Sequence, residues 1–219
     1  MPNTVLNETF KSVIQDKRVR AVIERLEAER RRSRAGSPND DGQSQDPYDY
    51  ADRGFSIHPD QGDLIYLLCR GMRASRVVEF ATSVGMSTLY FAAAMRDNGG
   101  GLVIGSELVP AKVATARRNL SEAGLADYAE IRQGDARQTL RDLGGSLDFA
   151  LIDGWPRDEE SSLAREVIEI VAPQLRVGGY VMNDNAEPDF LEFIRDPRNG
   201  FISITLPLKS GTELSVKVA

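Results

Sequence analysis

Acidic side chains recur at the ends of short apolar stretches in this chain. Glu107, Asp135, Asp153 and Asp184 each lie at or just beyond the end of such a stretch. A carboxylate can accept hydrogen bonds from two donors at once, and it can also bind hard cations. If the stretches are parallel strands, their carboxyl ends meet at one edge of a sheet, where ligands bind. The spacing therefore predicts a binding site assembled from successive strand ends.

A loop of small residues follows the first strand candidate. Residues 79–88 read EFATSVGMST, and small side chains let a backbone approach a ligand closely. The dinucleotide fingerprint requires three glycines, of which this loop supplies only Gly85, so an NAD-dependent oxidoreductase is poorly supported. Glu107 is suited to accept hydrogen bonds from ribose hydroxyls, and Asp135 from the exocyclic amine of adenine. The three strand ends together predict a nucleoside site.

Alternating strands and helices would position these residues. Strands are expected over 76–80, 102–106, 128–132, 147–152, 178–183, 201–206 and 213–218, and helices over about 87–95, 110–123, 163–171 and 189–195. This alternation predicts an α/β fold with a doubly wound parallel sheet. The last two strands are joined by turn residues 207–211, which predicts a C-terminal hairpin with an antiparallel strand.

The segment before this pattern divides in two. Residues 1–32 are expected to be a helical extension, with a helix over 4–32 whose apolar face holds Val19, Val22, Ile23 and Leu26. Residues 33–54 are expected to be a flexible linker or lid, because 33–47 contain a single apolar residue. A bare amphipathic helix is marginal in water, so docking on the main domain, residues 55–219, or formation of a homodimer is favoured over a solvated, loosely attached helix.

The motifs resemble those of a known family. Glu79-x-Ala81-x-x-x-Gly85, Glu107 and Gly134-Asp135-Ala136 are similar to the motif series of class I S-adenosylmethionine-dependent methyltransferases. The resemblance covers about residues 57–219. Within that class the chain looks like the catechol and caffeoyl-CoA O-methyltransferase type, and most like small bacterial relatives, through segments 96–101 and 119–125.

The resemblance implies a Rossmann-like fold with a seven-stranded, mostly parallel sheet, and S-adenosylmethionine as the cofactor. The residues expected to bind it are Glu79, Ala81, Thr82, Ser83, Gly85, Ser87, Glu107, Leu108, Asp135, Ala136, Asp153 and Trp155. One departure is Ala81, which stands where the family has its first loop glycine. A methyl group is small, so we expect a modest shift of the loop and an intact site.

The last two acids are predicted to form the reacting end of the site. In the topology that the family implies, Asp153 and Asp184 lie side by side. Two close carboxylates repel unless one is protonated or a cation lies between them. With the amide oxygen of Asn185 they would suit Mg²⁺ or another divalent cation, and the resemblance places metal ligands at these three positions. The plainer alternative is that Asp153 is a loop acid and Asp184-Asn185 a turn.

Three residues are candidates for catalysis: Asp153, His58 and Arg157. In the relatives a lysine that can act as a general base often follows the tryptophan, but here Pro156 and Arg157 follow Trp155. Arginine stays protonated, so Arg157 could stabilise an oxyanion but not remove a proton. His58 could accept a proton at neutral pH, although a histidine at the start of a helix is the more ordinary interpretation. Trp155 could wall a flat acceptor or pack at the strand end.

The resulting prediction is a metal-assisted methyl transfer from S-adenosylmethionine to a hydroxyl of a small acceptor. Two alternatives stay open: a metal-independent methyltransferase acting on another nucleophile such as an amine, and a non-catalytic S-adenosylmethionine-binding module. The net charge of −6 disfavours nucleic acid as a partner. The apolar runs are too short for a membrane span, and residues 1–10 lack a secretory signal, so a cytoplasmic protein is expected.

Overall fold

The computed structural model describes residues 12–36, 44, 46–154, 161–184, 187–209 and 211–219. Within them a seven-stranded sheet has the order β3-β2-β1-β4-β5-β7-β6. The strands are β1 (Arg76–Phe80), β2 (Leu102–Glu107), β3 (Ala129–Gln133), β4 (Leu147–Ile152), β5 (Leu175–Asn183), β6 (Phe201–Leu206) and β7 (Thr212–Lys217). Strands β1 to β5 run parallel, and β7 is antiparallel to both β5 and β6. This confirms the predicted mostly parallel sheet with a terminal hairpin.

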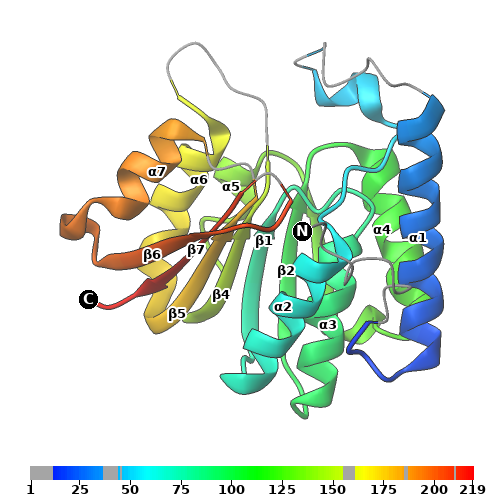
Figure 1. Cartoon of the computed structure of the whole chain (residues 1–219), viewed down its shortest axis with the longest axis horizontal. Coiled ribbons are helices and arrows are strands. Elements are labelled where there is room, and N and C mark those ends of the chain that lie inside the picture. The colour runs from blue at the N-terminus through cyan, green and yellow to red at the C-terminus, as the bar shows by residue number, and fades with distance from the viewer. Residues whose placement is uncertain (1–11, 37–43, 45, 155–160, 185–186, 210) are drawn as a thin grey trace, which may run out of the picture.

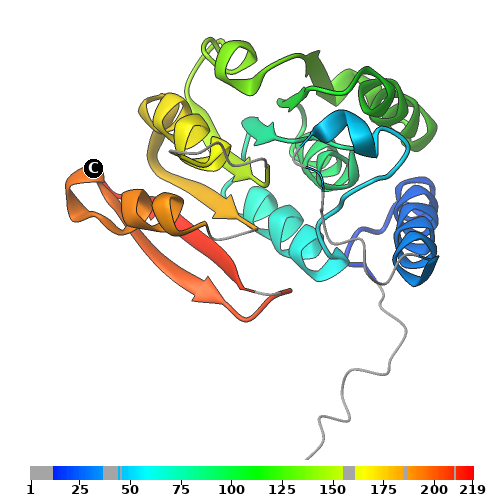
Figure 2. The same ribbon diagram turned by 90° about the horizontal axis from the view of Figure 1, so that it is seen from above.

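Helices cover both faces of the sheet (Figures 1 and 2). One face carries α2 (Pro59–Gly71), α3 (Met86–Asp97) and α4 (Pro110–Ala123), and the other carries α5 (Ala136–Thr139), α6 (Leu163–Val171) and α7 (Pro188–Arg195). Short 3-10 helices are η2 (Pro47–Tyr50), η3 (Ala126–Tyr128), η4 (Ala172–Gln174) and η5 (Pro197–Asn199). No helix in the described ranges is long and apolar enough to cross a membrane.

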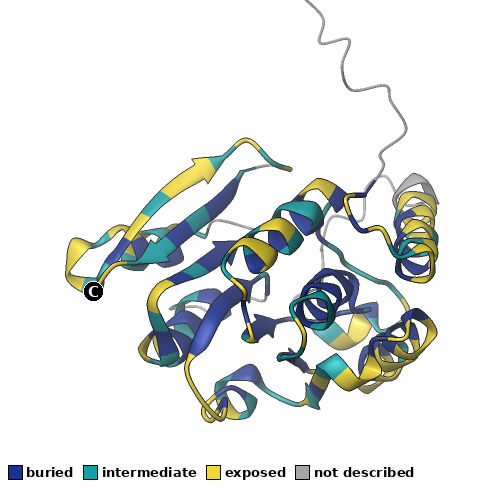
Figure 3. Ribbon diagram, turned by 90° about the horizontal axis from the view of Figure 1, so that it is seen from below, coloured by how far each residue is buried: buried dark blue, intermediate teal, exposed yellow. Residues whose placement is uncertain are grey.

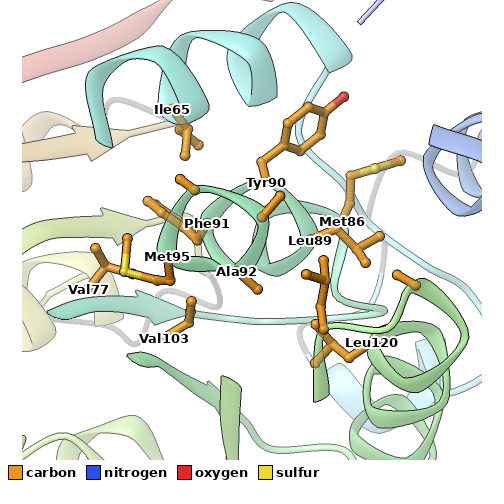
Figure 4. Close-up of a cluster of buried hydrophobic side chains, with 14 of the residues drawn as sticks. Ile65, Val77, Met86, Leu89, Tyr90, Phe91, Ala92, Met95, Val103 and Leu120 are labelled. Carbon is orange, nitrogen blue, oxygen red and sulfur yellow. The ribbon is translucent and has the colours of Figure 1, made fainter. Parts of the chain in front are cut away.

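Helix α3 is the centre of the larger core, because every residue from Met86 to Met95 is buried. Figure 4 shows its side chains pointing toward α2, α4 and the sheet. The ring of Phe91 meets that of Phe149 on β4 edge-on, with the centroids 5.2 Å apart. On the α2 side, a Cβ at Gly62 would come within 2.3 Å of the Tyr90 ring, so only glycine allows this close approach. Helix α3 thereby fixes β1 and the loop between them.

The N-terminal helix α1 (Lys17–Gly36) docks on α3 and α4 of the same chain. Asp16 caps it by accepting the backbone N–H of Arg18 at 2.7 Å and of Val19 at 3.3 Å. The predicted start at residue 4 is therefore wrong for residues 12–16, which are not helical, and residues 1–11 lie outside the described part. The predicted end at residue 32 is four residues early.

The apolar face predicted for this helix is confirmed. Val19, Val22, Ile23 and Leu26 are between 0 and 4% exposed, and all belong to the larger core. On the flank, the Arg25 guanidinium donates to the Asn119 side chain at 2.9 Å. Of the two predicted roles, docking on the main domain is the one that the structure shows. The homodimer stays a prediction, and this face no longer supports it.

Candidate active site

A cavity of about 450 Å³ opens at the carboxyl edge of the sheet. It is lined by residues that follow β1, β2, β3 and β4, as predicted, and also by segment 53–56 and by Arg30 and Ser33 of α1. Helix α1 is therefore part of the cavity wall. Seven of the predicted site residues line it: Ala81, Ser83, Glu107, Leu108, Asp135, Ala136 and Asp153.

Glu107 ends β2 at the cavity with its carboxylate held by two backbone groups. One oxygen accepts the N–H of Ser83 at 2.7 Å, and the other accepts the N–H of Val109 at 2.9 Å. The residue is 7% exposed. Because a carboxylate has about four acceptor sites, two remain after these bonds are made. A fixed, ionisable acceptor pair at this edge is suited to the two hydroxyls of a ribose.

The loop after β1 rests on a fully buried carboxyl group. Glu79 accepts hydrogen bonds from the hydroxyls of Ser87, at 2.7 Å, and Thr88. These hydroxyls therefore do not cap α3, and Gly85, with φ of 87°, occupies the N-cap. Burial raises the pKa of Glu79. Of the predicted cofactor residues, Glu79, Thr82, Gly85 and Ser87 are buried or lie in this loop and are not part of the cavity lining.

The same loop holds two non-glycine residues in the left-handed region. Ala81 has φ of 66° and Ser83 has φ of 51°. This conformation costs a residue with a side chain roughly 1–2 kcal/mol. The bond from the Ser83 N–H to Glu107 and the bond from the Phe55 N–H to the Ser83 hydroxyl, at 3.1 Å, hold the loop in place. Ala81 thus keeps a glycine-like backbone, consistent with the predicted intact loop.

Asp135 lies at the cavity but is already engaged. It caps α5 by accepting the backbone N–H of Arg137 at 2.8 Å, and it forms an ion pair with that guanidinium at 2.7 Å. These hydrogen bonds lower the pKa of Asp135. The Asp135 carboxylate is partly exposed, so it could accept a hydrogen bond from the exocyclic amine of adenine. That amine and the Arg137 guanidinium would then donate to the same carboxylate.

Asp153 and Asp184 lie side by side, as predicted, because β4 and β5 are neighbours. Ile152 pairs with Asn183 in the sheet, and each aspartate extends its strand by one residue. The Asp153 N–H donates to the Phe80 carbonyl and the Asp184 N–H to the Ile152 carbonyl, both at 3.4 Å. The Asp184 side chain is fully buried, whereas Asp153 lines the cavity.

Two groups that the sequence did not indicate contact this pair. The Lys209 ammonium, from the turn between β6 and β7, forms an ion pair with one oxygen of Asp184, and the Gln61 amide donates to the other. Burial and the charge of Asp184 raise the pKa of Asp153 well above its usual range. The Lys209 ammonium therefore offsets part of the negative charge that the two carboxyl groups bring to this edge of the sheet.

This arrangement does not fit the predicted divalent cation. A cation bound to Asp184 would lie close to the Lys209 ammonium, where like charges repel. The part of the chain that the structure describes contains no group of three or more His, Cys, Asp or Glu side chains able to hold a metal. The third predicted ligand, Asn185, lies outside the described residues, so the metal site stays a prediction.

Of the remaining predicted residues, His58 lies in the described part of the chain and is not part of the cavity lining. His58 precedes α2, where its backbone N–H donates to the Gln61 side chain at 2.7 Å, and burial lowers its pKa. This is the ordinary helix-start position, and its catalytic role stays a prediction. Trp155 and Arg157 lie outside the described residues.

Lys209 and Gln61 were missed by sequence reasoning. Lys209 reads as a turn residue between two strands, and only the strand order reveals its position. Because β7 pairs antiparallel with β5, with Glu213 opposite Asn183, the turn before β7 lies beside the carboxyl end of β5. The predicted hairpin could have indicated this position of Lys209, had its second strand been placed next to the fifth parallel strand.

Comparisons with known proteins agree with this geometry. Residues 78–186 match the family model of a methyltransferase domain. A catechol O-methyltransferase of Mycobacterium tuberculosis is 32% identical over 145 residues, which cover 62% of this chain and 64% of that enzyme. A catechol O-methyltransferase of Niastella koreensis is 34% identical over 142 residues, covering 60% and 63%. The matches thus span less than two thirds of either relative.

The fold is shared with solved O-methyltransferases. The structure of an O-methyltransferase from Bacillus cereus in complex with SAH has a TM-score of 0.65 and 21% identity, and the match covers 94% of this chain and 93% of that one. At this identity the likeness shows the fold alone.

Proposed function

We propose that this chain, which belongs to the class I S-adenosylmethionine-dependent methyltransferases, transfers the cofactor's methyl group to a hydroxyl of a small acceptor. The proposal rests on the position of the Glu107 carboxylate in the cavity wall, where the backbone N–H groups of Ser83 and Val109 hold it. A ribose bound there would place the rest of the cofactor along the Ala81–Ser83 loop. The methyl group would then face Asp153.

The hydroxyl acceptor is supported by the relatives, both of which are named catechol O-methyltransferases. The cavity is compatible with a small, flat molecule, because Phe55 and Phe80 line it along with the charged groups. Transfer needs the acceptor oxygen in line with the sulfonium methyl, so the protein contributes mainly by positioning and by a fixed electrostatic environment. The transfer is proposed to proceed without a metal ion, because the Lys209 ammonium already lies beside Asp184.

The test is transfer of labelled methyl from S-adenosylmethionine to a panel of small phenols, amines and thiols. We expect label on an ether oxygen, and loss of transfer in the Glu107→Ala variant. Label on nitrogen or sulfur would contradict the hydroxyl acceptor. Cofactor binding without transfer to any member of the panel would favour a non-catalytic binding module.

A further inference from the structure

Lys209 brings a positive charge to the place where the acceptor must react. Its ammonium contacts a fully buried oxygen of Asp184, yet its side chain is 29% exposed and lines the same cavity as Asp153. An ammonium has three N–H donors, and only one is needed for Asp184. Two donors remain for a ligand in the cavity.

The position of this ammonium is fixed from several sides. Asp184 is buried between β5 and α2, where the Gln61 amide donates to Asp184 and also to the Thr212 hydroxyl at 2.8 Å. The Gln61 carbonyl oxygen in turn accepts the backbone N–H of His58 at 2.7 Å. The Thr212 hydroxyl donates to the carbonyl of Leu208, next to Lys209, at 3.3 Å. These bonds tie the hairpin turn to α2 and hold Lys209 at the edge of the sheet.

We propose that the Lys209 ammonium serves in this chain as the cation of the reacting site, binding the acceptor oxygen in place of a divalent metal ion. The inference rests on the proposed function. It assigns Lys209 a catalytic role, and it assigns Asp184 and Gln61 the role of positioning that ammonium.

The transfer step balances without a metal. The acceptor hydroxyl first loses its proton to solvent water, and the two free N–H groups of Lys209 stabilise the oxyanion. The oxyanion attacks the sulfonium methyl, an O–C bond forms, and the C–S bond breaks with its electrons going to sulfur. The products are the methyl ether and neutral S-adenosylhomocysteine. A single ammonium favours acceptors with one acidic hydroxyl, such as a phenol bearing an electron-withdrawing group.

The first test compares metal dependence. The metal-free wild-type enzyme should transfer methyl to a nitrophenol equally well in EDTA and in Mg²⁺. Mn²⁺ titration followed by electron paramagnetic resonance should show no tight site in the wild type. In Lys209→Met, which frees an oxygen of Asp184, Mn²⁺ should bind. Activity lost in EDTA and restored by Mg²⁺, or tight Mn²⁺ binding to the wild type, would overturn the inference while leaving the proposed function standing.

The second test examines the lysine. Lys209→Met should lower kcat/KM by about 100-fold, the typical effect of losing one oxyanion donor, with binding of S-adenosylhomocysteine unchanged. The acceptor's ionisation, read from the pH profile of kcat, should shift to higher pH, and Lys209→Arg should restore part of the rate. Lys217→Met, on the same hairpin but bonded to backbone carbonyls, is the control. An unchanged pH profile in Lys209→Met would contradict the role. Absence of both cofactor binding and transfer in the wild type would refute the proposed function itself.

Discussion

At the scale of single residues, Ala81 is a position where the backbone conflicts with the side chain. Its φ of 66° favours glycine, so Ala81→Gly should relieve roughly 1–2 kcal/mol of strain. The greater freedom of glycine in the unfolded chain offsets about 0.4–1 kcal/mol of this. We therefore expect an unfolding free energy that is unchanged or raised by up to about 1.6 kcal/mol, measured by urea denaturation.

Ala126→Gly is the matched control, because Ala126 is exposed and lies in the short helix η3. It should lose about 0.4–1 kcal/mol. If Ala81→Gly loses as much stability as Ala126→Gly, this would contradict a left-handed backbone conformation at Ala81.

Glu79 provides a prediction for pH. Burial raises its pKa in the folded state above the value of 4.5 that is ordinary for glutamate. The folded protein then binds more protons at this site than the unfolded chain, so the contribution of Glu79 to stability is full below about pH 4.5 and is lost as pH rises through the folded pKa. The unfolding free energy of the wild type minus that of Glu79→Gln should therefore fall as pH rises, by at most about 1.4 kcal/mol per unit.

Urea denaturation of both proteins across the range from acid to neutral pH measures this difference. A difference that stays constant, or that grows with pH, would show that Glu79 is not held in an environment that favours its protonated form.

Residue types at strand ends could be predicted from the sequence, but their partners could not. Glu107 is identifiable because an acid after a buried strand reaches the carboxyl edge in any doubly wound sheet. Its bonds to Ser83 and Val109, and the pairing of Asp135 with Arg137, depend on loop conformations that no local pattern specifies. Lys209 depends on the strand order, which is a property of the whole sheet.

At the scale of elements, the docking of helix α1 on the main domain should contribute to the stability of the chain. Ile23 is 3% exposed against the larger core, so Ile23→Ala should cost about 2–5 kcal/mol, whereas Glu24→Ala, on the exposed face, should cost little. Thermal and urea unfolding measure both. Because the face is covered within one chain, the loss should not depend on protein concentration.

A loss below about 0.5 kcal/mol for Ile23→Ala would mean that α1 is not docked in solution. A loss that grows on dilution would indicate that the face is covered by a second copy of the chain.

The boundaries of α1 show where sequence patterns fail. The predicted end was residue 32, yet the helix continues to Gly36, and Glu27 pairs with Arg30 and Arg31 within its charged part. Such pairs at spacings of three and four residues stabilise exposed helix without any apolar signal. By contrast, the strands β1, β4 and β6 begin and end at the predicted residues, since their apolar runs are bounded by turns.

At the scale of the whole molecule, the fold follows from alternation and burial. Strands β1 and β4 are buried on both faces, as central parallel strands between two helix layers must be, and short apolar stretches in the sequence mark them. The hairpin is more exposed: Ile202 and Ile204 on the edge strand β6 are each 60% exposed, and Figure 3 shows this strand as largely exposed. The class of fold was therefore predictable, whereas the docking of α1 on the main domain was one of three open outcomes.

The central claim is that this edge of the sheet binds the nucleoside of S-adenosylmethionine, and calorimetric titration of S-adenosylhomocysteine tests it most directly. We expect binding at one site per chain in the wild type and in Glu130→Ala, an exposed acid on β3 that serves as the control. Glu107→Ala should weaken binding by about ten- to a hundred-fold, as expected for lost hydrogen bonds to a charged group. Absence of binding to the wild type, or equal binding to Glu107→Ala, would contradict the account.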